Sequence, residues 1–176
     1  MEQTNIHTFD ISVPGTTTYT GSGRIDGTIL DQFSISEYEG VLRVATTVGQ
    51  WNRWWMDDTE PMSSSIITLV RGVDPALDQP ILQEYGRLDG IAETERIWSA
   101  RFVEDRAYLV TFRNIDPLLT IDLSNPMSPE ILGELKVPGV STYIQPINED
   151  MLLTIGMACW RRWAWARLVE YSPFNL

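Results

Sequence analysis

The same pattern of a strand, an acidic turn and a more apolar strand occurs three times in this sequence. The copies cover residues 33–46, 101–112 and 143–155, and their apolar runs are short enough for strands and too short for helices. Aligning Val44, Val110 and Leu153 gives spacings of 66 and 43 residues. The second spacing fits a repeated sheet of about 40–45 residues, and the first exceeds it. We interpret the polar, Trp-rich residues 50–65 as a loop inserted into the longer copy.

The second half of each copy repeats as well, as an apolar strand followed by a strand that closes at a glycine. This half occurs at residues 7–27, 65–90 and 119–139. A repeat of this period is typical of a β-propeller and not of a sandwich. The sequence therefore predicts an all-β protein, a partial β-propeller of about three four-stranded antiparallel blades. The expected segments are residues 6–27 as the outer part of a blade, 28–90 as a blade with the inserted loop 50–65, 91–139 as another blade, and 140–156 as the start of the next.

Residues 157–176 differ in composition from the rest of the chain. They hold three of the seven Trp residues and three Arg against one Glu, whereas the preceding residues carry 10 basic and 23 acidic side chains. We interpret this atypical C-terminal tail as a truncated or frame-shifted gene end; an amphipathic terminal helix is the alternative.

Several stretches resemble exported bacterial and archaeal proteins that carry a C-terminal β-propeller domain of their own family. The stretches are residues 31–47, 95–112 and 116–139, and the similarity covers residues 6–156. The resemblance implies a propeller with more blades than fit here, so that this chain looks like a fragment. It also implies an extracellular, periplasmic or cell-envelope location, although the polar N-terminus is not a signal peptide. It brings no catalytic residues.

The composition excludes several classes of function. The net charge of −11 repels nucleic acid and anionic membranes, and no apolar run is long enough to span a bilayer. With one histidine, His7, and one cysteine, Cys159, the chain lacks the residues for a thiol-ligated or His-rich zinc site and for a Ser-His-Asp triad. Gly21-Ser22-Gly23 is interpreted as a strand-end turn and not a phosphate loop, because no helix follows it. We expect no enzyme and no obligatory cofactor.

The inserted loop holds the best candidates for a metal and for a partner. Asp57, Asp58 and Glu60 offer carboxylates for Ca²⁺, without the spacing of a dedicated loop, so a solvated loop is the simpler interpretation. Exposed Trp clusters bind sugars or proteins through flat apolar rings. The cluster consists of Trp51, Trp54 and Trp55, whose alternative role is to cap the propeller core.

Three arginines flank the expected inner strands, namely Arg96, Arg101 and Arg113. They are candidates to bind an anionic group in the channel, although structural ion pairs with Asp105 and Asp116 are the simpler interpretation.

These observations favour a non-catalytic binding or scaffold module of an exported propeller protein. The alternatives are a propeller hydrolase or lactonase with a channel metal, and a polysaccharide or cell-wall binding module. The expected partners are a protein or a polysaccharide, together with the remaining blades or a second copy of the chain. The hydrolase requires Asp57, Asp58, Asp105 and Asp116 to converge.

Overall fold

The computed structural model describes residues 2–49, 62–112, 116–137 and 139–157. These residues form twelve strands and a single short 3-10 turn, η1 (Gln32–Ser34), which confirms the expected all-β class. The strands are β1 (Gln3–Asp10), β2 (Thr18–Asp26), β3 (Ile35–Tyr38), β4 (Val41–Val48), β5 (Ser63–Asp74), β6 (Gln79–Ile91), β7 (Arg96–Val103), β8 (Arg106–Phe112), β9 (Asp116–Asp122), β10 (Glu130–Val137), β11 (Val140–Asn148) and β12 (Met151–Met157).

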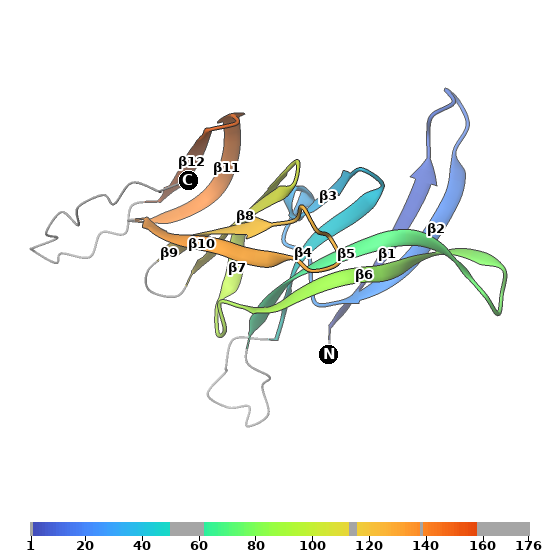
Figure 1. The fold of residues 1–176 in the computed structure, drawn as a ribbon, viewed down its shortest axis with the longest axis horizontal. Coiled ribbons are helices and arrows are strands. Elements are labelled where there is room, and N and C mark those ends of the chain that lie inside the picture. Colours follow the sequence, from blue (N-terminus) through green and yellow to red (C-terminus); the bar gives the residue numbers. More distant parts are fainter. Residues whose placement is uncertain (1, 50–61, 113–115, 138, 158–176) are drawn as a thin grey trace, which may run out of the picture.

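The described strands form three sheets, which follow one another along the long axis of the molecule (Figure 1). The first is six-stranded, in the order β1-β2-β6-β5-β4-β3; the second is four-stranded, in the order β10-β9-β8-β7; the third is the β11-β12 hairpin. Neighbouring strands within each sheet pair antiparallel, except β2 and β6, which are parallel through one bridge, Ser22 to Ile81, so the six-stranded sheet is mixed.

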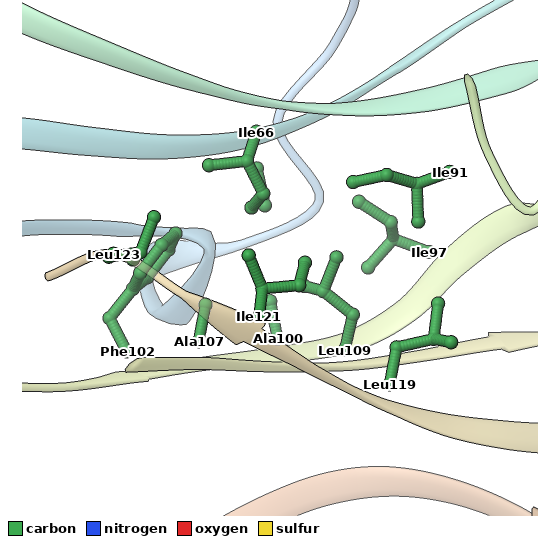
Figure 2. Packing of buried hydrophobic residues seen from close by; sticks show 11 residues of the cluster. Ile66, Ile91, Ile97, Ala100, Phe102, Ala107, Leu109, Leu119, Ile121 and Leu123 are labelled. Atoms are coloured by element: carbon green, nitrogen blue, oxygen red, sulfur yellow. The ribbon is translucent and has the colours of Figure 1, made fainter. Parts of the chain in front are cut away.

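The main core fills the space between the six-stranded and the four-stranded sheet. Ile66 of β5 and Ile91 at the end of β6 pack against Leu109 and Ile121 of the second sheet, and all four side chains are fully buried (Figure 2). β8 is buried along both of its faces, because neighbouring residues Leu109 and Val110 are both covered. This agrees with its nearly continuous apolar sequence, which is typical of a strand with neighbours on both sides.

A second core covers the opposite face of β4–β6. Ile6 of β1 and Ile25 of β2 pack there against Val44 and Ile67, so the β1-β2 hairpin folds over the sheet. A Cβ at Gly23 would lie 2.8 Å from the Leu82 Cβ, and only glycine lets β2 approach β6 this closely. Because β2 runs from Thr18 to Asp26, the segment Gly21-Ser22-Gly23 lies inside this strand, and its interpretation as a strand-end turn is wrong.

The hairpin registers place the repeats slightly differently from the sequence alignment. The first residues after the three acidic turns are Val41, Arg106 and Met151, which pair with the last residues before the turns and lie 65 and 45 residues apart.

β5 begins at Ser63, so residues 63–65 belong to this strand and not to the inserted loop. The reason is that Ser64 and Ser65 are buried against β4 and bond to Thr47 and Asp89, at 3.2 and 2.7 Å.

Two outer parts of the fold are more exposed than their sequences indicate. Leu153 is 47% exposed, although Leu152-Leu153 resembles a strand buried on both faces. The reason is that among the described residues β12 pairs only with β11. The alternating sequence of β10 is typical of a strand with one buried face, but Leu132 and Leu135 are both half-exposed in this edge strand.

Candidate functional site

A cavity of about 310 Å³ lies where turns of the six-stranded and the four-stranded sheet meet. It is open to solvent, and its walls come from the β3-β4 hairpin, the β7-β8 turn and the connection that leads from β9 to β10. The lining residues are Tyr38, Glu39, Val41, Arg43, Asp105, Leu123, Ser124 and Pro126.

The β3-β4 turn has the backbone of a tight two-residue hairpin. Glu39 and Gly40 both have positive φ angles, of 52° and 81°, which matches the twist of the flanking strands. The Gly40 N–H donates to the Glu37 carboxylate at 2.6 Å. The acidic turn thus uses one carboxylate to close itself and leaves that of Glu39 at the rim of the cavity.

Arg43 of β4 is the most deeply buried charged group beside the cavity, with 3% of its surface exposed. Its guanidinium donates to the backbone oxygen of Glu104 and, at 2.9 Å, to the Ser36 hydroxyl. The rings of Tyr38 and Phe102 lie 5.2 and 5.3 Å from it, within cation–π range. Arg43 therefore ties the first sheet to the β7-β8 turn of the second.

Arg43 was not among the predicted site residues, although the sequence carries a signal for it. The residue interrupts the apolar run Val41-Leu42-Arg43-Val44-Ala45, in the centre of the more apolar strand of its repeat. A charged residue at such a position requires partners, because an unpaired buried charge is very costly.

The residues that line the cavity carry charges of both signs. Burial lowers the pKa of the Arg43 guanidinium. At the rim, the Glu39 carboxylate raises the pKa of the Tyr38 phenol, and Glu104 and Asp105 add to this effect. The floor of the cavity therefore carries a buried cation, and its entrance carries carboxylates.

A turn after β9 holds the third wall of the cavity in place. The Asp122 carboxylate accepts the Ser124 N–H at 2.8 Å, and this hydrogen bond lowers the pKa of Asp122. Asp10 at the end of β1 and Asp74 at the end of β5 accept the N–H two residues further on in the same way, both at 2.8 Å. The three units therefore share one turn chemistry, an Asx turn after their equivalent strands.

Arg101 joins a separate cluster of side chains from η1, β7 and β11. Its guanidinium lies 4.8 Å from the centre of the Phe33 ring and donates to the Gln145 amide oxygen at 3.1 Å. The Tyr143 hydroxyl donates to the same oxygen at 2.6 Å, and the Tyr143 ring meets that of Phe33 edge-on. In the described part of the chain Arg101 forms no ion pair; Asp105 instead lies 4.0 Å from Arg106.

Among the other predicted site residues that the structure describes, Asp105 lines the cavity and Arg96 does not. Arg96 lies over the Trp98 ring at 5.4 Å, in β7. In the β8-β9 pair, Arg106 lies opposite Asp122 and Val110 lies opposite Leu118. Asp105 and Asp116 are therefore at opposite ends of the pair and cannot share a metal. The residues that lie outside the described part are Trp51, Trp54, Trp55, Asp57, Asp58, Glu60 and Arg113.

The described ranges hold no group of three His, Cys, Asp or Glu side chains that lie close enough together to bind a metal ion. They also contain no helix that is long and apolar enough to cross a membrane.

Comparison with known proteins gives the family. The model of a β-propeller domain family matches residues 1–167, which extends beyond the similarity expected for residues 6–156. An uncharacterised protein of Methanocaldococcus jannaschii is 42% identical over 135 residues, which cover 77% of this chain and 20% of the relative. An uncharacterised protein of Archaeoglobus fulgidus is 36% identical over 156 residues, covering 89% of this chain and 21% of the relative. The chain spans about a fifth of the length of these curated relatives, consistent with a fragment of a longer protein. It belongs to the β-propeller domain family.

Proposed function

We propose that this chain is a non-catalytic binding and scaffold module, one part of a β-propeller in a longer exported protein. Two of its antiparallel four-strand units, β3–β6 and β7–β10, serve as complete blades. β1-β2 is the outer half of a preceding blade, and β11-β12 is the inner half of a following one. In this assignment β2 and β6 belong to different blades, and the parallel bridge between them is a single residue pair, Ser22 to Ile81.

The observation that carries the proposal is the open apolar face of β12. Leu153, Ile155 and Met157 lie on one side of this strand and are 47%, 56% and 61% exposed. On the same face of the equivalent strand β8, Val110 is only 2% exposed. Neighbouring apolar side chains that remain open on a soluble domain mark a surface that another element covers. The side chains of β12 therefore suit packing against the blade that comes next in a propeller.

A substitution experiment on this 176-residue chain tests the scaffold role. We expect the wild-type chain to bind a hydrophobic dye and to associate with increasing concentration in sedimentation velocity. The double substitution Leu153→Ser with Ile155→Ser should reduce both effects. The matched control replaces Ile11 and Val13 by serine, two exposed residues at the β1-β2 hairpin, and should change neither. A monomeric wild-type chain without dye binding would refute the role of β12.

The partner contacts are proposed to come from connections between strands. The candidate is the connection between β4 and β5, which carries Trp51, Trp54 and Trp55. Replacing the three tryptophans by alanine should abolish retention of the chain on an insoluble polysaccharide if the partner is a glycan. Retention equal to that of the wild type removes the glycan and leaves a protein as the proposed partner.

A further inference from the structure

The cavity beside Arg43 combines two features that a singly charged ligand does not satisfy together. Its floor is the buried guanidinium of Arg43, and its entrance carries the carboxylates of Glu39 and Asp105. We propose that this cavity binds a small zwitterion, an α-amino acid with an apolar side chain, with its carboxylate at Arg43 and its ammonium group at the rim. The inference deepens the binding function proposed above and rests on it.

Arg43 supplies the reason for a negative group at the floor. Its two terminal nitrogens donate to the Glu104 carbonyl and to Ser36, but its Nε is buried without an acceptor among the described residues. No described carboxylate forms an ion pair with it. The carboxylates of Glu37 and Asp105 act on its charge only from beyond ion-pair distance, so within the described ranges the buried guanidinium has no directly bonded anion to offset its desolvation. A ligand oxygen that reaches the floor supplies it.

The rim supplies the reason for a positive group at the entrance. Glu39 and Asp105 extend from the turns of two different sheets, and their field is the one that raises the pKa of Tyr38. A free carboxylate passing this rim meets two like charges, and a free amine faces the guanidinium at the floor. A zwitterion matches both ends.

The walls and the volume of the cavity indicate the side chain and the size of the ligand. Val41, Leu123 and Pro126 give it an apolar side, which suits an aliphatic side chain. Its volume of about 310 Å³ is at the lower end of the range of about 300–1,000 Å³ for small-molecule sites. A single amino acid is therefore a better match than a long peptide.

The test is a titration of the ¹⁵N-labelled chain followed through the Nε–H signal of Arg43. The probes are L-valine, 3-methylbutanoate, which has only the carboxylate, and 2-methylpropylamine, which has only the amine. We expect L-valine to shift the Arg43 signal saturably and to bind at least about fivefold more tightly than either half-probe. No saturable shift with L-valine, or an equal response to 3-methylbutanoate, overturns the proposal.

A second test changes the rim of the cavity and leaves Arg43 in place, so its result does not depend on whether an Arg43 variant folds. Glu39→Gln with Asp105→Asn should weaken L-valine binding at least about fivefold and strengthen 3-methylbutanoate binding. The control, Glu149→Gln with Asp150→Asn, removes the same charges from the β11-β12 turn, outside the cavity, and should bind L-valine as the wild type does. Unchanged L-valine binding in the rim variant also overturns the proposal. Neither variant alters the open face of β12, so association through β12 is judged separately.

Discussion

Replacing Gly86 by alanine tests how the second sheet docks on the first. A Cβ at Gly86 would collide with the carbonyl oxygen of Pro126 and lie 2.6 Å from that of Met127. Both obstacles are backbone atoms, so no side-chain rotation relieves the contact. The connection between β9 and β10 must therefore move away from β6. This movement strains the 2.6 Å hydrogen bond from the buried Thr68 hydroxyl to the Pro126 oxygen. We expect G86A to lower the free energy of unfolding by about 1–3 kcal/mol, the usual cost of overpacking.

Urea denaturation measures this difference, with Gly133→Ala as the matched control. Gly133 lies in β10, and a Cβ there would meet nothing within 4 Å. The control should stay within about 0.5 kcal/mol of the wild type. Thermal unfolding should show the same order, because about 1 kcal/mol corresponds to about 2–4 °C in a chain of this size. Equal unfolding free energies for the two alanine variants would refute the packing argument and the close approach of the connection to β6.

Three further predictions use the same assays. Ile66→Ala, at a fully buried position, should cost about 2–5 kcal/mol in urea denaturation, whereas Leu132→Ala, at a half-exposed one, should cost less than about 0.5 kcal/mol. The pKa of Asp122 is lowered in the folded chain, so its stabilisation is present above its ordinary pKa of 3.8 and is lost as the pH falls through the folded value. Asp122→Asn should therefore have a smaller loss of stability between neutral and acidic pH, and an unchanged loss would contradict the assignment. Arg101→Gln and Phe33→Leu should show a coupling energy of about 0.5–1 kcal/mol in a double-mutant cycle; additive effects would exclude the cation–π contact.

The strands were predictable because their apolar runs and turn residues are local features. The copies at residues 33–46, 101–112 and 143–155 were each expected to end in an apolar strand, and β4, β8 and β12 are these strands. The Asx turn after β9 was equally accessible, because Asp122 and Ser124 form it within three residues of chain.

The candidate cavity was less predictable, because its residues come together only when two sheets pack. Glu39 and Asp105 belong to the acidic turns that the repeat predicts, but their meeting depends on the docking of the β7-β8 turn on Arg43. The alignment of the repeats has no information on this contact. Arg101 shows the same limit, since its predicted carboxylate partners gave way to Gln145 and Phe33 of neighbouring repeats.

The contacts between the sheets explain why a repeated sequence gives sheets with different environments. Arg43, Thr68, Ser99 and Arg101 each bond to a residue of the adjacent sheet, and among the described residues none of these bonds recurs at the equivalent positions of the other units. The apolar period specifies strands that any unit can form, and such strands alone would allow several orders of stacking. Polar side chains of one sheet that fit only one neighbour exclude the wrong orders, because a mismatch leaves buried donors without acceptors. We infer that these four residues, and not the repeated apolar ones, determine which sheet packs against which.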